Sequence, residues 1–491
     1  MKITELLKYV PYYKTKNQIE NISIQNISMD SRAVRPGDLF VCIRGYEVDG
    51  HKFAADAVER GAAAIVAEEE LEAEVPVIIV NDSSRALAML ASAFYHNPTE
   101  KLNLIGVTGT NGKTSVTYLL DEIFRADQQT TGLIGTIQMS IAGTPYPVKN
   151  TTPDSLSLQE SFAKMCEAKV DTAVMEVSSH ALDQGRVFGS DFDVAVFTNL
   201  SQDHLDYHDN MDDYLRAKSL LFAQLGNSYN VERAKFAIIN NDSPAAKKLI
   251  RSTAQPVLTY GVNQKADLMA SDIDLHEKGV SFTMETPMGS IHIESPLMGL
   301  FSVYNMLASA GAALVSGVSL QVIQQAFKHS KGVRGRFEPV LEGQEFGVVV
   351  DYAHTPDSLE NVLKTMKDFC RGTIHVVVGC GGDRDRSKRA VMADVAMKYG
   401  DDIIFTSDNP RTEDPHRILE DMTSHLSSGY EVIEDRKQAI KRAVNRAQQG
   451  DIILIAGKGH ETYQEINGVR YDFDDREVAR ELLRHSKESN T

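Results

Sequence analysis

A glycine-rich segment that ends in a lysine and a threonine has the residue types needed to bind a nucleotide phosphate. Residues 102–114 read LNLIGVTGTNGKT, and the helix-like sequence SVTYLLDEIF follows. In a strand–loop–helix unit of this kind, glycines let backbone N–H groups approach phosphate oxygens, and the helix N-terminus adds partial positive charge. Lys113 adds a full charge, and the Thr114 hydroxyl can reach Mg²⁺.

The spacing departs from the strict P-loop pattern, because Gly106 comes one position early and residue 107 is Val107. An ordinary glycine-rich turn is the alternative, but the Gly-Lys-Thr ending favours a phosphate site. We therefore predict a nucleoside triphosphate site. Its predicted contacts are Gly109, Thr110, Asn111, Gly112, Lys113, Thr114 and Ser115.

Two further strands are expected to end near this loop. The apolar run TAVME ends in Glu176, which is placed like the acid that holds Mg²⁺ in P-loop enzymes. The run VAVFTNL leads to Asp203 and His204, which could complete a metal site. A surface acid and a hydrogen-bonded histidine are the structural alternatives.

The last third of the chain repeats one pattern. The strands FGVVV, IHVVV, IIFT and IILI each run into a polar loop. Ligands of open α/β sheets bind beyond the carboxyl ends of the strands, so we expect the loop side chains on one rim. Helix capping is the alternative, but it does not call for two arginines at strand ends. The expected rim residues are Asp351, His354, Arg384, Asn409, Arg411, Lys458 and Glu461.

These elements predict an α/β protein with three domains. A chain of 491 residues is too long for a single core. We expect a small α/β domain at 1–98, a central P-loop domain with a parallel sheet at 99–332, and a C-terminal Rossmann-like domain at 333–491. Residues 257–295 alternate polar and apolar side chains and are expected to form antiparallel strands.

Composition excludes several classes of protein. A net charge of −17 argues against non-specific binding to nucleic acid or to an anionic membrane. We find no signal peptide and no apolar run of about 18 residues, the length of a membrane span. The four cysteines form no CxxC pair. We therefore expect a cytoplasmic protein with reduced thiols, and we expect a monomer.

The motifs taken together resemble those of the Mur ligase family, ATP-dependent amino-acid ligases of peptidoglycan synthesis. The resemblance covers nearly the whole chain. Its motifs are GVTGTNGKT, NTTPD, MEVSSHAL, NLSQDHLDYH, RAKSLLF, VYN, GVRGRFE, VDYAHTPDSL, GCGGDRDRSKR, SDNPRTEDP and AGKGHE, with DSR and GDLF near the N-terminus.

The resemblance implies roles for individual residues. Lys113, His204 and Lys218 would be catalytic, and Thr114, Glu176, His204 and Lys218 would form the metal site, with Lys218 carried as a carbamate whose oxygen can bind Mg²⁺. Further ATP contacts would come from Asn305, Arg336, Asp351 and His354. The UDP-muramoyl-dipeptide would contact Ser31, Thr151, Thr152, Ser178, Gln184 and Arg186.

The third amino acid of the peptide would be meso-diaminopimelate. The form Asn409-Pro410-Arg411 matches the ligases that add it, and Arg411 offers a planar fork for a carboxylate that lysine lacks. The implied pocket consists of Arg384, Asp408, Asn409, Pro410, Arg411, Gly457 and Glu461.

The implied reaction joins this amine to the γ-carboxylate of D-glutamate in UDP-MurNAc-L-Ala-D-Glu. An acyl phosphate would form from ATP, with charge neutralised by Lys113 and a pair of Mg²⁺ ions, and domain closure would bring the amine to it. The alternatives are an L-lysine-adding ligase, a folylpolyglutamate synthetase, which the residues before the phosphate loop disfavour, and a P-loop regulatory ATPase whose hydrolysis needs no amino acid.

Overall fold

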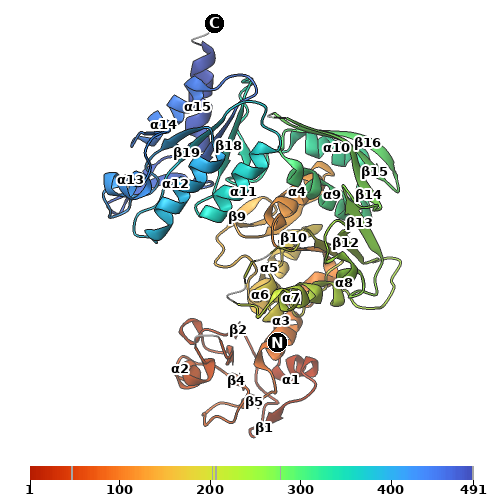
Figure 1. Cartoon of the computed structure of the whole chain (residues 1–491). Coiled ribbons are helices and arrows are strands. Elements are labelled where there is room, and N and C mark those ends of the chain that lie inside the picture. Colours follow the sequence, from red (N-terminus) through yellow and green to blue (C-terminus); the bar gives the residue numbers. More distant parts are fainter. Residues whose placement is uncertain (46–47, 202, 205–206, 277, 489–491) are drawn as a thin grey trace. The chain divides into compact units, whose positions relative to one another are not determined.

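The computed structural model describes residues 1–45, 48–201, 203–204, 207–276 and 278–488. Two compact units make up the chain: residues 1–259 with 311–317, and residues 260–310 with 318–491. The strand β13 (Val257–Gly261) and the helix α9 (Leu300–Val315) each belong partly to both. The domain boundaries predicted at residues 98 and 332 stay a prediction. Figure 1 labels many of the elements of both units.

The first unit begins with a five-stranded sheet in the order β1-β5-β4-β3-β2, in which only β1 is antiparallel to its neighbour among the described pairs. Its strands are β1 (Lys14–Thr15), β2 (Ile27–Ser28), β3 (Leu39–Val41), β4 (Ala64–Ala67) and β5 (Val77–Ile79). The helix α3 (Ser83–Phe94) packs Leu87 and Leu90 into the same core as Ile78 and Val66. This confirms the small α/β segment predicted before the phosphate loop.

A larger sheet follows, in the order β12-β11-β6-β10-β7-β8-β9 within this unit. Its strands are β6 (Asn103–Thr108), β7 (Thr131–Ile134), β8 (Met139–Ile141), β9 (Thr144–Tyr146), β10 (Thr172–Glu176), β11 (Val194–Phe197) and β12 (Phe236–Asn240). The strand β6 lies between β10 and β11, and all three are parallel, with Glu176 opposite Val107 and Phe197 opposite Thr108. Their carboxyl ends therefore lie together beside the loop that follows β6.

Helices cover this sheet because each carries an apolar face. Phe162 of α5 and Phe222 of α7 are fully buried in one cluster with Met175 and Phe197, and α4 contacts β6, β7 and β10. The helices of the unit are α1 (Ile3–Leu6), α2 (Ala54–Glu59), α3 (Ser83–Phe94), α4 (Lys113–Ala126), α5 (Ser155–Glu167), α6 (Ser179–Asp183), α7 (Met211–Ala223) and α8 (Ala246–Ile250), with 3₁₀ turns η1 (Leu7–Tyr9), η2 (Ser31–Ala33), η3 (Gly50–Phe53) and η4 (Pro98–Lys101).

In the second unit, β14 (Leu268–His276), β15 (Gly279–Thr286) and β16 (Gly289–Ser295) form the predicted antiparallel ribbon. The prediction is wrong for β13, whose residues Tyr260 and Gly261 pair with β14 in parallel. The parallel pairing is confined to Tyr260 with Leu268 and Gly261 with Met269, and residues 262–267 connect the two strands.

The rest of the second unit is a doubly wound sheet in the order β17-β18-β22-β19-β20-β21, parallel except for β17. Its strands are β17 (Glu338–Pro339), β18 (Gly347–Asp351), β19 (Ile374–Val378), β20 (Asp402–Phe405), β21 (Tyr430–Val432) and β22 (Ile452–Ala456), and a separate hairpin joins β23 (Tyr463–Ile466) to β24 (Val469–Asp472). This confirms the predicted Rossmann-like arrangement.

Alternate residues of these strands enter two different cores. Val376 and Leu454 pack with α11 and α12, whereas Val377 and Ile455 pack with α14 and α15. The helices are α10 (Leu320–His329), α11 (Pro356–Lys367), α12 (Ser387–Tyr399), α13 (Pro415–Thr423), α14 (Arg436–Arg446) and α15 (Asp475–Glu488). None of the helices in the described part of the chain combines the length and the apolar character needed to cross a bilayer.

Candidate active site

The glycine loop lies between β6 and α4, as predicted. Gly109 has φ +149°, and a Cβ built on it would lie 1.9 Å from Thr198 Oγ1, so only glycine fits. Gly112 caps α4 with φ +86°, and Lys113, Thr114 and Ser115 open the helix. The Lys113 ammonium donates to the carbonyls of Gly109 and Thr110 at 3.0 and 2.9 Å. The loop thus concentrates positive charge at a helix N-terminus.

Asn199, which follows β11, holds the middle of the loop. The Thr110 N–H donates to its carbonyl at 2.9 Å, and the Asn111 N–H donates to its Oδ1 at 3.0 Å. Thr198 Oγ1 donates to the Asn111 carbonyl at 2.6 Å. These two N–H groups therefore face β11 in this conformation.

Glu176 lies next to the start of α4 and is almost fully buried, with 1% of its surface exposed. Thr114 Oγ1 lies 3.0 Å from both carboxylate oxygens, and the Thr136 N–H donates to Oε1 at 2.8 Å. A Cβ on Gly135 would lie 2.5 Å from Oε1, so this glycine leaves the space that the carboxylate occupies. The adjacent hydroxyl and carboxylate oxygens are the ligand types that Mg²⁺ prefers.

Lys218 projects from α7 into the same loop and is fully buried. Its ammonium donates to the Gly109 carbonyl at 2.8 Å and lies 4.2 Å from the centre of the Tyr214 ring. Burial, and secondarily repulsion by Lys113, lowers the pKa of Lys218 well below its usual value. A lysine in this state loses its proton readily and becomes a nucleophilic amine.

His204 lies after β11, with φ +55° and a half-exposed side chain. Its ring meets the His180 ring edge-on at 5.0 Å, and its Nε2 is 3.5 Å from Asp203 Oδ2. Within the described ranges, no three His, Cys, Asp or Glu side chains gather closely enough to hold an ion. An ion bound here would therefore need hydroxyl, phosphate or modified-lysine oxygens beside Glu176.

The residues predicted to bind the muramoyl-dipeptide form one network, apart from Ser31. Thr152 Oγ1 donates to the Glu176 carbonyl at 2.9 Å, and Arg186 Nη1 donates to the Thr152 carbonyl at 3.2 Å. Gln184 Oε1 accepts from Arg186, and Ser178 Oγ caps α6. Thr151 Oγ1 lies 3.1 Å from Thr136 Oγ1. These links connect the network to the carboxylate of the phosphate site.

Gln184 and Arg186 line a cavity of about 430 Å³. Ser31 begins the turn η2 and is buried, and Met29, two residues earlier, reaches the cavity wall. Arg44 lines the same cavity and is held by Glu68 at 3.1 Å and Glu69 at 2.8 Å. Sequence reasoning missed Arg44, because an arginine beside two acids has no motif of its own.

A second cavity, of about 400 Å³, lies at the carboxyl ends of the C-terminal sheet. It brings together most of the predicted amino-acid pocket and adds residues that the sequence did not single out. The predicted pocket members on its wall are Arg384, Asp408, Asn409, Arg411, Gly457 and Glu461. His354, predicted as an ATP contact, lines the same cavity, and the additional residues include Tyr352, Cys380, Asp385, Lys388 and Arg389. Pro410, also predicted for the pocket, does not line the cavity, and its carbonyl oxygen lies so close to Gly382 that a Cβ there would approach it to 1.9 Å.

Arg411 has a left-handed backbone, with φ +52°. Its N–H donates to the Glu465 carbonyl at 2.9 Å, and its carbonyl accepts from the Asn467 N–H at 2.6 Å. Its Nη1 donates to the Gly382 carbonyl at 2.6 Å, which directs the guanidinium to the cavity wall. The hairpin β23–β24 thus holds the backbone while the side chain is left to face the cavity.

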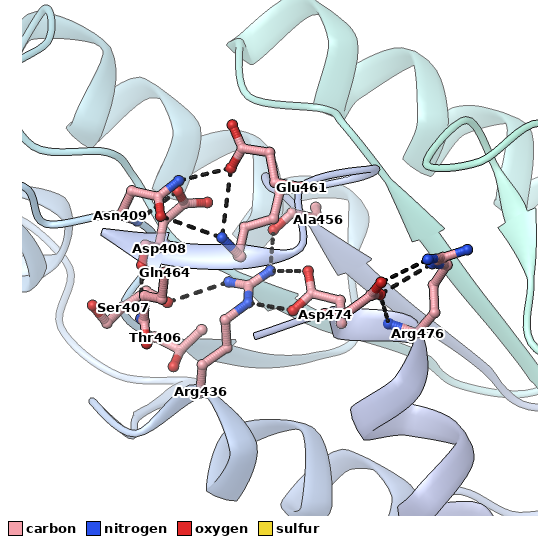
Figure 2. Close-up of polar contacts among 12 residues, drawn as sticks. Thr406, Ser407, Asp408, Asn409, Arg436, Ala456, Glu461, Gln464, Asp474 and Arg476 are labelled. Carbon is pink, nitrogen blue, oxygen red and sulfur yellow. Dashed lines mark hydrogen bonds and ion pairs between the residues drawn. The ribbon is translucent and has the colours of Figure 1, made fainter. Parts of the chain in front are cut away.

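Lys458 and Asp351 lie beneath the surface, so the expectation that they stand on the open rim is wrong. Lys458 is fully buried, and its ammonium lies 3.3 Å from Asn409 Oδ1 and 3.5 Å from Glu461 Oε2. Asn409 Nδ2 donates to the same Glu461 oxygen at 2.7 Å, as Figure 2 shows. Asp351 is buried and accepts from the Phe337 N–H at 2.6 Å. The residues next to them, Tyr352 and Gly457, line the cavity, so the chain reaches its wall while the side chains of Asp351 and Lys458 turn inward.

The predicted adenine and ribose contacts in this unit gather on Tyr352, except for Asn305. The Arg336 guanidinium lies 5.5 Å from the Tyr352 ring centre, and the His354 ring lies 4.5 Å from it. Burial raises the pKa of Asp351, which precedes Tyr352. Asn305 is buried in α9 and makes none of these ring contacts within the described residues.

Comparison with known proteins accounts for this arrangement. Three family models match in succession: the Mur ligase family, catalytic domain, at residues 23–95, the Mur ligase middle domain at 107–313, and the Mur ligase, glutamate ligase domain at 335–459. The α/β fold with these three parts is confirmed, and the protein is a ligase.

Curated relatives match over nearly their whole length. The chain is 56% identical to the UDP-N-acetylmuramoyl-L-alanyl-D-glutamate–2,6-diaminopimelate ligase of Oceanobacillus iheyensis, covering 99% of this chain and 100% of the relative. It is 57% identical to the protein of the same name from Bacillus cereus, covering 94% and 95%. A solved structure with that name is 36% identical, covers 98% and 99%, and has a TM-score of 0.77.

These relatives match nearly the whole length of the sequence, and the three family models match successive parts of it. The chain therefore belongs to the Mur ligase family.

Proposed function

We propose that the protein joins meso-diaminopimelate to the γ-carboxylate of D-glutamate in UDP-MurNAc-L-Ala-D-Glu, using ATP, in peptidoglycan synthesis. The observation that carries this proposal is the C-terminal cavity, which combines Arg384 and Arg411 with Asn409 and Glu461 on one wall. The names of the relatives that match over nearly the whole chain support the same substrate.

The cavity suits an amino acid with a charged group at both ends. Arg411 offers a planar fork for the carboxylate at the distal centre of diaminopimelate, and Arg384 adds a second cation nearby. Glu461 directs Oε2 toward Asn409 and Lys458, so Oε1 can accept the distal ammonium. Lysine has the ammonium but not the distal carboxylate, and it would leave Arg411 without that partner.

The phosphate loop supplies the ATP end of the reaction. Lys113 lies at the helix N-terminus, where it can turn from the loop carbonyls to the γ-phosphate. Thr114 and Glu176 would hold Mg²⁺, because a hydroxyl and a buried carboxylate stand side by side in a space that Gly135 leaves open. When bound, Mg²⁺ neutralises charge on the phosphate oxygens.

Lys218 would carry the carbamate. Its buried amine and lowered pKa favour the neutral form that reacts with CO₂, and the product would place a negative oxygen beside Lys113. His204 would be a further ligand of the metal site. These assignments, like those of Ser31, Asn305, Arg336 and His354, are part of the proposal.

The reaction would proceed in two steps. The γ-carboxylate oxygen attacks the γ-phosphorus of ATP, the bond to ADP breaks, and an acyl phosphate forms. The diaminopimelate amine then attacks the acyl carbon, the amide forms, the amine loses a proton and inorganic phosphate leaves. Positioning and charge neutralisation by Lys113 and the arginines of the cavity provide the catalysis.

A ligation assay tests the proposal. The protein is incubated with ATP, Mg²⁺, UDP-MurNAc-L-Ala-D-Glu and either meso-diaminopimelate or L-lysine, and product mass and ADP release are measured. We expect the diaminopimelate product, with ADP release that depends on both substrates. Faster turnover with lysine would refute the assignment of the cavity, and ADP release without either substrate would favour a regulatory ATPase. We also propose that the protein is cytoplasmic and monomeric. The molar mass of the purified protein, measured by light scattering, would check the monomeric state.

A further inference from the structure

A fully buried ion pair lies beneath the C-terminal cavity, and neither of its two residues lines the cavity. Arg436, the first residue of α14, donates from Nε and Nη2 to the two carboxylate oxygens of Asp475, at 2.7 and 2.8 Å. Asp475 is the first residue of α15, and both side chains are 0% exposed. Burying such a pair is costly in free energy unless the remaining donors are satisfied.

The remaining donors of Arg436 bind the backbone just before two segments of the cavity. Nη2 donates to the Ala456 carbonyl at 2.9 Å, and Nη1 donates to the Ser407 carbonyl at 3.4 Å, as Figure 2 shows. Ala456 ends β22 and precedes Gly457, and Ser407 follows β20 and precedes Asp408. One guanidinium therefore connects the carboxyl ends of two strands that β19 separates in the sheet.

The two connected segments also touch each other. A Cβ on Gly457 would lie 2.4 Å from Asp408 Oδ2, so the chain of Gly457 passes directly over that carboxylate. Gln464 Nε2 donates to the Asp408 carbonyl at 2.7 Å, and the Glu465 N–H donates to Asn409 Oδ1 at 2.9 Å. The segment 408–411 is thus held by β23 on one side and, through Ser407, by Arg436 below.

We propose that the Arg436–Asp475 pair is a positioning device for the amino-acid cavity, a role that rests on the proposed function. The planar guanidinium sets the separation of the segments that begin at Asp408 and Gly457. Asn409, Arg411 and Glu461 belong to these segments, so this separation decides whether they reach one substrate together. Arg436 acts through them and does not touch the substrate.

The test compares Arg436→Lys with Arg476→Lys in the full-length protein. Lysine keeps the charge but cannot bind Asp475 and two carbonyls in one plane. Arg476, the neighbour of Asp475 in α15, is a matched control. It pairs with Asp474 and Glu338 and does not bind Ser407 or Ala456. The measurements are KM for each of the three substrates, kcat and the thermal midpoint.

We expect Arg436→Lys to raise KM for diaminopimelate about tenfold or more, since small displacements of positioning groups are costly. KM for ATP and for UDP-MurNAc-L-Ala-D-Glu should stay within about twofold, and the control should leave all three unchanged. A lower thermal midpoint with an unchanged KM for diaminopimelate would overturn the proposal.

If Arg436→Lys does not fold, the same measurements are made on the double variant Arg436→Met/Asp475→Leu, which leaves no unpaired buried charge. If the double variant folds and shows the raised KM, the proposal is supported; if it fails to fold as well, the pair serves general stability and the proposal is overturned. A wild-type protein that ligates another amino acid refutes the proposed function alone. The same KM comparison is then made with that amino acid, so the two failures are distinguishable.

Discussion

Replacing Arg411 with asparagine separates its side-chain role from its unusual backbone. Arg411 has φ +52°, a region that asparagine occupies more readily than most residues, so Arg411→Asn adds no backbone strain. The change removes the Nη1 bond to the Gly382 carbonyl and the fork that would bind the distal carboxylate. Any loss of diaminopimelate use in this variant therefore reports the guanidinium itself.

The expected size follows from the interaction that is lost. A hydrogen bond to a charged group contributes about 1.5–3 kcal/mol, and we take about 2–3 kcal/mol for the paired bonds because such terms are not additive. At about 1.4 kcal/mol for each factor of ten, kcat/KM for diaminopimelate should fall roughly 30- to 150-fold. Lysine has no distal carboxylate, so its kcat/KM should change little.

The assay is ADP release at saturating ATP and UDP-MurNAc-L-Ala-D-Glu, with diaminopimelate or lysine varied. KM for ATP serves as the internal control, and the thermal midpoint should stay close to that of the wild type. An unchanged kcat/KM for diaminopimelate would refute the role of Arg411. A fall of equal size for both would show that the cavity had collapsed rather than lost one contact.

Three further predictions concern two lysines at the phosphate loop and the buried carboxyl of Asp351. Lys113→Ala should abolish ADP formation and weaken nucleotide binding measured by calorimetry, and wild-type affinity would contradict the phosphate site. Lys218→Met should abolish turnover while the fold persists by circular dichroism, and labelled bicarbonate should be incorporated into the wild type but not the variant; equal labelling would refute the carbamate. Burial raises the pKa of Asp351, so the contribution of this carboxyl to the stability of the wild type should fall as pH rises above about 3.8, where the unfolded carboxyl ionises first. Asp351→Asn should remove this loss, making the variant the more stable at neutral pH in denaturant titrations, and parallel pH profiles would contradict it.

Local sequence determined much of the fold and of the first site. The glycine loop could be predicted because positive φ, which Gly109 and Gly112 both have, is a local requirement of a strand–loop–helix turn. The four apolar runs of the last third could be assigned to parallel strands, since runs buried on both faces lack polar alternation. The family motifs then supplied the roles of residues far apart in the chain.

Tertiary structure decided which of these polar residues face a cavity and which lie beneath it. Lys458 and Glu461 are three residues apart, yet one is fully buried and the other lines the cavity. Arg436 and Asp475 have no motif, and their pairing depends on how α14 and α15 pack on the same face of the sheet. Sequence specifies the residue types and the direction of each strand, but the burial of a charge depends on the elements that close over it, and only the folded chain brings those together.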